Sequence, residues 1–145
     1  MYKHILIATD GSELAGKAVA AGLELAKAVG AKVTAINVTE PWTALVGGEM
    51  GVAFPYQDYD KNAADSAAQI LAGVSDKAKM AGVECATQHI PDRFPAEAIV
   101  DCAKERACDL IVMASHGRRG LSKLLLGSET VRVLTHTTVP VLVCR

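Results

Sequence analysis

Residues 110–128, which read LIVMASHGRRGLSKLLLGS, decide the fold. The stretch opens with a short apolar run, LIVMA, which is too short for a helix and typical of a buried strand. A break around Gly117 follows, and the stretch ends at Gly127-Ser128, where Ser128 is expected to cap a helix over the next residues. A strand end, a glycine loop and a helix N-terminus therefore meet. Free backbone N–H groups and the positive end of a helix dipole at such a place suit a phosphate.

The spacing of the two glycines resembles the nucleotide loop of the universal stress protein family. ATP-binding members of that family carry Gly-x2-Gly-x9-Gly-Ser/Thr, and Gly117 is followed by nine residues and then Gly127-Ser128. The resemblance covers essentially the whole chain, from residues 5–12 (ILIATDGS) to residues 140–143 (PVLV). Ala114 stands where the family has its first glycine. Because alanine keeps its backbone N–H, the resemblance implies a retained site with a lower affinity.

The length and composition favour a single cytoplasmic domain spanning residues 1–145. The net charge of −1 and the lack of a basic block argue against a nucleic-acid partner. No secretory signal and no apolar segment long enough to cross a bilayer are visible, so no membrane association is expected. The cysteines form no CxxC pair and no metal-ligand spacing, and we expect free thiols at Cys85, Cys102, Cys108 and Cys144.

Short apolar runs alternate with helical patterns along the chain. Strands are expected at residues 4–9, 33–38, 83–90, 109–114 and 139–144. Helices are expected from the cap Ser12 to residue 29, and at residues 61–81, 95–107 and 128–136, with Gly30 and Gly82 as helix ends. The long apolar connection at residues 39–60 is expected to be partly helical and is a candidate lid over a ligand.

This alternation predicts an α/β fold: a single doubly wound, five-stranded parallel sheet with helices on both faces. The pattern alone leaves the strand order open. The resemblance implies the order 3-2-1-4-5, which reverses between the first and fourth strands. Ligands bind at such switch points, beyond the carboxyl ends of the strands. The turns after these two strands, at Thr9-Asp10 and at residues 114–117, are therefore the expected site.

The resemblance also implies roles for individual residues. Val38 is expected beside the adenine, and Met113 and Ala114 against the ribose. The phosphates would contact Gly117, Gly127, Ser128, and both the backbone and the side chain of Thr130, while Glu129 offers only its backbone. The complete set of expected nucleotide-binding residues is Ala8, Thr9, Asp10, Val38, Met113, Ala114, Gly117, Arg118, Gly127, Ser128, Glu129 and Thr130.

Several side chains in these turns have more than one interpretation. Asp10 either accepts hydrogen bonds from the nucleotide, or holds the water shell of Mg²⁺, or bonds its own turn. Arg118 and Arg119 either neutralise phosphate charge or are solvated surface groups, and Lys123 is a weaker candidate. His116 is either a general base or, the interpretation we favour, a group that holds the loop by a hydrogen bond.

Motifs for catalysis are missing from the sequence. It contains neither a P-loop, nor a dinucleotide GxGxxG after the first strand, nor a nucleophile elbow. No residue is identified that would position a water or an acceptor for phosphoryl transfer. Binding is therefore better supported than turnover, no catalytic residue is assigned, and weak ATP hydrolysis is the most that is expected.

The last strand predicts a homodimer. Residues Val139 to Cys144 are strongly apolar, yet the implied order places them at a sheet edge, where an uncovered strand would aggregate. Pairing with the same strand of a second copy covers that edge. The alternative is an edge covered by a loop of the same chain.

Three functions remain open. The first is a cytoplasmic ATP-binding stress-response protein, a nucleotide-dependent sensor or regulator, with Mg²⁺ as a further candidate ligand and a cyclic nucleotide as a variant of this interpretation. The second is an enzyme that transfers an adenylyl group. The third is a nucleotide-free dimeric interaction module. Neither the stress signal nor a protein partner follows from the sequence.

Overall fold

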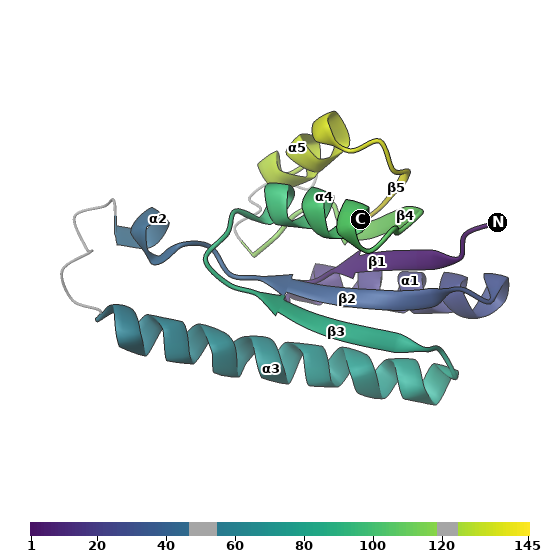
Figure 1. The fold of residues 1–145 in the computed structure, drawn as a ribbon, viewed down its shortest axis with the longest axis horizontal. Helices are drawn as coiled ribbons and strands as arrows, with labels where there is room; N and C mark the ends of the chain where they lie inside the picture. Colours follow the sequence, from purple (N-terminus) through teal and green to yellow (C-terminus); the bar gives the residue numbers. More distant parts are fainter. Residues whose placement is uncertain (47–54, 119–124) are drawn as a thin grey trace.

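A computed structural model of the chain describes residues 1–46, 55–118 and 125–145. Its sheet has five parallel strands in the order β3-β2-β1-β4-β5, so the expected fold class and strand order are both confirmed (Figure 1). The elements are β1 (His4–Ala8), α1 (Glu13–Val29), β2 (Lys32–Val38), α2 (Trp42–Val46), α3 (Tyr56–Ala81), β3 (Cys85–Ile90), α4 (Pro95–Glu105), β4 (Leu110–Ala114), α5 (Ser128–His136) and β5 (Val141–Cys144).

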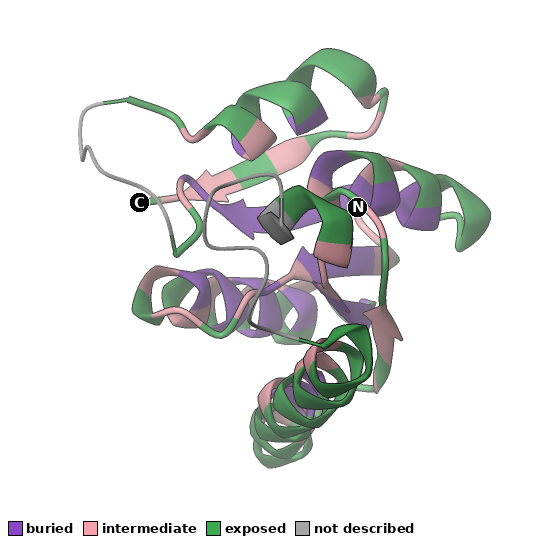
Figure 2. Cartoon of the chain, turned by 90° about the vertical axis from the view of Figure 1, so that its left-hand side faces the viewer, coloured by how far each residue is buried: buried purple, intermediate pink, exposed green. Residues whose placement is uncertain are grey.

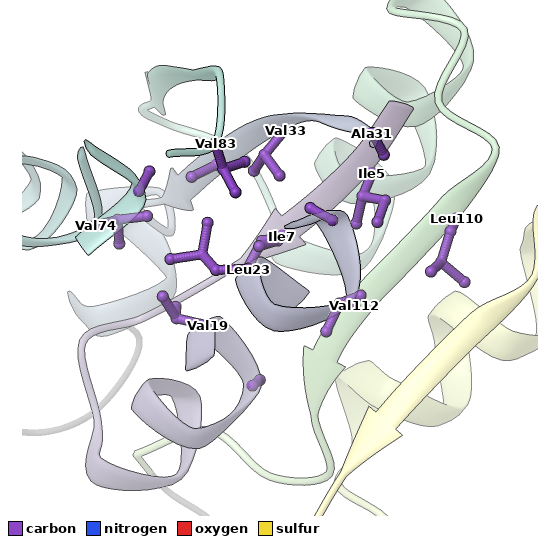
Figure 3. Packing of buried hydrophobic residues seen from close by; sticks show 14 of the residues in the cluster. Ile5, Ile7, Val19, Leu23, Ala31, Val33, Val74, Val83, Leu110 and Val112 are labelled. Atoms are coloured by element: carbon purple, nitrogen blue, oxygen red, sulfur yellow. The ribbon is translucent and has the colours of Figure 1, made fainter. Parts of the chain in front are cut away.

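Two hydrophobic cores lie on opposite faces of the sheet because successive strand residues point to opposite sides. Ile5 and Ile7 of β1 pack in the core formed with α1 and α3, as Figure 3 shows for Ile7, Val19 and Leu23. Leu6, between them, belongs to the core formed with α4 and α5. Figure 2 looks along the sheet from the carboxyl ends of the strands and shows the central strands buried between helices with exposed outer faces, while β3 and β5 at the edges are partly exposed.

The ends of α1 follow the expected chemistry. The Ser12 hydroxyl accepts a hydrogen bond from the N–H of Ala15 at 3.2 Å and so caps the first turn. Gly30 ends the helix with φ of 70°, a left-handed conformation that glycine adopts without steric cost. Gly82 ends α3 in the same way, with φ of 72°.

Some boundaries differ from those expected. The helix expected from residue 61 begins at Tyr56, directly after Pro55, so α3 has 26 residues. The helix expected to reach residue 107 ends at Glu105, because Ala107 turns to a positive φ of 51°. The strands differ by no more than two residues at either end. Residues 42–46 of the long connection are helical, as expected for part of it, and residues 47–54 lie outside the described ranges.

The four cysteines are free thiols, as expected. Burial raises the pKa of Cys108 to about 11. Burial also raises the pKa of the Cys102 thiol. The raised pKa values favour the thiol over the reactive thiolate, and both side chains pack in the core as small apolar groups. Within residues 1–46, 55–118 and 125–145, none of the helices combines the length and apolar character that a bilayer crossing requires.

Candidate nucleotide site

A cavity of about 760 Å³ lies beyond the carboxyl ends of β1, β2 and β4. Its volume falls in the range of small-molecule pockets. The N-terminus of α5 and one face of α3 complete its walls. All the residues expected from the sequence line it: Ala8, Thr9, Asp10, Val38, Met113, Ala114, Gly117, Arg118, Gly127, Ser128, Glu129 and Thr130. The structure therefore brings the expected set together, and their contact with a nucleotide stays a prediction.

Asp10 ties the turn after β1 to the loop after β4. One carboxylate oxygen accepts the N–H of Ser12 at 2.9 Å, the bond expected of a turn aspartate. The other accepts the N–H of Arg118 at 2.9 Å, and the Arg118 Nε donates to the Asp10 carbonyl at 3.0 Å. Arg118 thus holds the two turns together. Its neighbour Arg119, and Lys123, lie outside the described residues.

Gly127 lets two backbone segments approach closely. Its N–H donates to the Ser115 carbonyl at 2.7 Å, and a Cβ at this position would lie 3.0 Å from the same oxygen. A contact this tight leaves a Cβ at position 127 room only if the Ser115 carbonyl gives way by a few tenths of an ångström. The Thr130 hydroxyl donates to the carbonyls of Ala114 and Ser115, each at 3.1 Å. Its proton is used inside the loop, so the expected phosphate contact is left to the Thr130 backbone N–H, not its hydroxyl.

Among the described residues, no side chain caps the N-terminus of α5. The expectation that Ser128 caps this helix is wrong: Gly127 occupies the cap position, and Ser128 is the first helical residue. The first N–H groups of a helix have no carbonyl partner within it, and Gly127 brings no side chain to accept from them. These donors and the positive end of the helix dipole lie at the cavity wall, where an anion would satisfy them.

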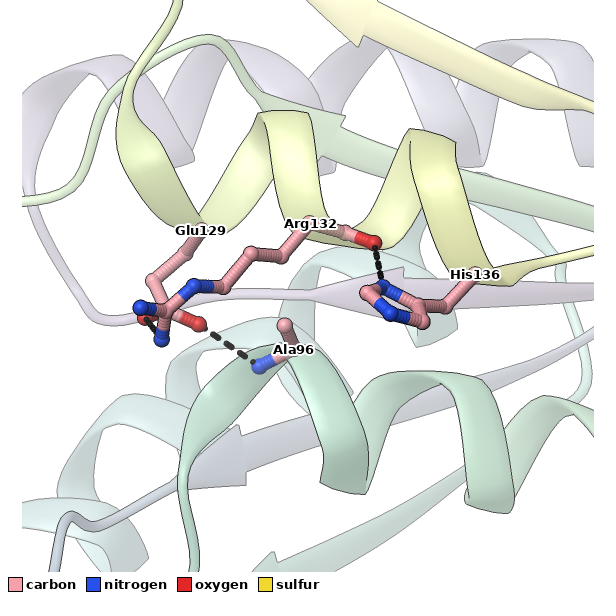
Figure 4. Close-up of polar contacts among 4 residues, drawn as sticks. All are labelled: Ala96, Glu129, Arg132 and His136. Carbon is pink, nitrogen blue, oxygen red and sulfur yellow. Dashed lines mark hydrogen bonds and ion pairs between the residues drawn. The ribbon is translucent and has the colours of Figure 1, made fainter.

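The Glu129 side chain does not take part in the anion-binding end of α5, because it bonds α4 and Arg132. Its Oε2 accepts the N–H of Ala96 in the first turn of α4 at 2.9 Å, and its Oε1 accepts from Arg132 at 3.3 Å (Figure 4). Phe94, at the cap position of α4, makes no side-chain cap bond, so Glu129 supplies the cap from the neighbouring helix. This agrees with the expectation that only the Glu129 backbone faces a ligand.

Glu129→Ala is expected to lower the free energy of unfolding by about 1 kcal/mol, because it removes this cap from α4. Urea unfolding followed by circular dichroism measures the change. Glu129→Gln is the matched control, since its amide oxygen still accepts from Ala96 and should restore most of the loss. Equal stabilities of the alanine variant and the wild type would show that the cap contributes nothing.

Two histidines near the cavity already have partners. The Nδ1 of His116 lies 2.9 Å from the Ser115 hydroxyl, which agrees with a histidine that holds the loop. The Nε2 of His89 lies 2.7 Å from the hydroxyl of Thr39, a cavity residue. Burial lowers the pKa of His89, which favours its neutral form. These bonds engage one nitrogen of each ring, so a role for either histidine as a general base gains no support from them.

Ala114 adopts an ordinary strand conformation as the last residue of β4. Among the described residues, the only non-glycine positions with positive φ are Asp92 and Ala107. The backbone at position 114 therefore needs no glycine, and its methyl group costs no strain. The methyl group of Ala114 can therefore weaken ligand binding only by occupying space in the cavity.

Sequence reasoning missed the α3 side of the cavity. Side chains from positions 59, 62, 63, 66 and 70 line it, at the spacing of one helix face. This spacing in the sequence could have identified the cavity face of α3, but the helix was expected to begin only at residue 61. His116, a candidate from the sequence, also lines the cavity, and the other lining residues not expected from the sequence are Ala15, Ile36, Asn37, Thr39, Glu40, Pro95 and Ile99.

Metal-binding groups do not gather in the parts of the chain that the structure describes. No three side chains of His, Cys, Asp or Glu lie close enough together there to hold an ion. Asp10 alone brings a carboxylate to the turn after β1. A magnesium ion at this cavity would need ligand oxygens from a bound phosphate.

The sequence and the fold are both similar to those of known proteins. The profile of the universal stress protein family matches residues 1–145. Universal stress protein YxiE of Bacillus subtilis is 31% identical over 149 residues, which cover 100% of both chains. The structure of hypothetical protein MJ0577 from Methanocaldococcus jannaschii is similar with a TM-score of 0.80 at 28% identity, over 99% of this chain and 96% of that one. A universal stress protein in complex with cAMP gives a TM-score of 0.69 at 26% identity, over 99% and 97% of the two chains.

Proposed function

The chain belongs to the universal stress protein family, and from this we propose that it is a stress-response protein that binds ATP in the cavity above β1, β2 and β4. One observation carries the proposal: the uncapped N-terminus of α5 forms a wall of the same cavity as the turn after β1. An anion-binding end and a less polar end in one pocket suit a nucleotide. The similar structure that holds cAMP supports an adenine ligand.

The phosphates lie against the backbone N–H groups of residues 128–130 in this proposal. The ribose contacts Met113 and Ala114, and the adenine packs beside Val38 at the end of β2. Mg²⁺ would be coordinated mainly by phosphate oxygens, with Asp10 contacting its water shell. The protein then acts as a nucleotide-dependent sensor or regulator in the cytoplasm.

A cyclic nucleotide is the second candidate ligand, because one similar structure is a complex with cAMP. A single phosphate would use fewer of the N–H groups at the N-terminus of α5 than a triphosphate. The uncapped helix end therefore favours ATP over cAMP in this chain.

The chain also forms a homodimer through β5 in our proposal. This strand is at the edge of the sheet, and its central residue Leu142 is 39% exposed. Val131 and Leu134 of α5 are also apolar and exposed, at 46% and 43%. A second copy paired along β5 would cover the open edge and part of this apolar surface.

Identification of the retained nucleotide tests the binding function. Purified protein is denatured with acid, the released small molecules are separated by chromatography, and ATP and cAMP are then titrated into nucleotide-free protein by calorimetry. We expect retained ATP and tighter binding of ATP than of cAMP. Tighter binding of cAMP would reverse the choice of ligand. Protein that retains no nucleotide and gives no heat with either one would favour a nucleotide-free interaction module.

A further inference from the structure

One wall of the cavity has no role in the nucleotide placement proposed above. The N-terminal half of α3 extends past the carboxyl ends of β2 and β3 (Figure 1). Its cavity face consists of uncharged side chains, which are Tyr59, Asn62, Ala63, Ser66 and Ile70. An uncharged wall suits the base of a nucleotide better than its phosphates. The proposed phosphate position is at the N-terminus of α5, which follows β4, and β1 separates β4 from β2 in the sheet.

Asn37, near the end of β2, points toward this side of the sheet. Val33 and Ala35 of the same strand pack in the core with α1 and α3, and strand side chains alternate, so Asn37 shares their face. Only 6% of Asn37 is exposed, and the residue lines the cavity. Asn37 is therefore a buried amide beside the uncharged α3 wall.

The orientation of this amide is determined by its one hydrogen bond. The Nδ2 of Asn37 donates to the Thr9 carbonyl at 2.9 Å. A carbonyl only accepts, so the NH₂ group must face Thr9 and the Oδ1 must face the other way. The structure shows no hydrogen bond to this oxygen from the described residues, and among them no fully buried polar side-chain atom lacks a partner. The Oδ1 therefore keeps its small accessible surface, and we assign that surface to the cavity.

We propose that the Oδ1 of Asn37 selects the base by accepting a hydrogen bond from the 6-amino group of a purine. This inference rests on the nucleotide-binding function proposed above and names how its site distinguishes ligands. Because the amide cannot turn round without losing its bond to Thr9, the position accepts a donor and rejects another acceptor. A 6-oxo purine, such as guanine or hypoxanthine, would place a carbonyl oxygen against Oδ1. Two facing acceptors repel, and both lose their contact with water.

Calorimetric titration of ATP and inosine triphosphate tests this inference, because position 6 carries an amino group in ATP and a carbonyl in inosine triphosphate, whose N1 also carries a proton. In the wild type we expect the Kd of inosine triphosphate to be about tenfold higher than that of ATP, or more. In Asn37→Leu, which has a similar shape and no acceptor, the ratio of the two Kd values should fall to near one, mainly through weaker ATP binding. The ratio is measured within one preparation, so a partly unfolded fraction cancels.

The outcomes separate this inference from the function on which it rests. A wild-type ratio near one, or an unchanged ratio in Asn37→Leu, overturns the role of Asn37 and leaves ATP binding intact. Failure of the wild type to bind either ligand overturns both. If Asn37→Leu does not fold, the inference is tested on the wild type by titrating purine riboside triphosphate, which has hydrogen at position 6. Its affinity should lie between those of ATP and inosine triphosphate, and affinity equal to that of ATP contradicts the inference.

Discussion

Gly117→Val is expected to lower the affinity for ATP by about 100-fold or more, and isothermal titration calorimetry measures the loss. A Cβ at position 117 would lie 3.1 Å from a carboxylate oxygen of Asp10, the one that accepts the N–H of Arg118. The two methyl groups of valine would displace this carboxylate and fill the space where phosphate must approach. The φ of Gly117 lies outside the left-handed region, so valine can adopt the backbone. The cost therefore falls on the loop at the site, including the bond between Asp10 and the N–H of Arg118, and not on the sheet.

Gly73→Ala is the matched control for this variant. Gly73 lies inside α3, and a Cβ there would have no atom within 4 Å. Alanine should raise the free energy of unfolding by about 0.5–1 kcal/mol through its better helix propensity and leave ATP affinity unchanged. Wild-type affinity in Gly117→Val would show that no part of the ligand approaches this glycine.

The sheet was predictable because its signals are local. Each strand is a short apolar run, and each helix has apolar residues at helical spacing, so the order of elements can be read directly. The cap at Ser12 and the glycine end at Gly30 depend on neighbouring residues only, and both are confirmed. The strand order came from a family resemblance, since the pattern of elements does not choose among orders.

The details of the site were less predictable because they depend on contacts between distant residues. The cap position of α5 is Gly127 and not Ser128, and the Gly127 N–H bonds the Ser115 carbonyl, a contact between two loop segments that the sequence does not show. The Thr130 hydroxyl is used by the same loop. Asn37 was not identified, since its importance follows from a bond to Thr9, 28 positions away. Sequence spacing identifies the glycine loop and the helix N-terminus whose backbone N–H groups can bind a phosphate. Tertiary contacts decide which side chains remain free for a ligand.

Val143→Pro is expected to convert the proposed homodimer into a monomer, measured by sedimentation equilibrium. The carbonyl of Pro140 accepts the N–H of Ile111, and the carbonyl of Cys144 accepts the N–H of Ser115, so these two residues of the β5 segment direct their backbone groups toward β4. Backbone groups of successive strand residues point to alternate sides, so the N–H of Val143 points away from β4, toward the open edge of the sheet. Proline at this position removes a donor that only a partner strand would use, and edge strands tolerate it. Val143→Ala, which shortens the side chain and keeps the N–H, is the control and should remain dimeric. A Val143→Pro variant that stays dimeric would show that the two copies associate through another surface.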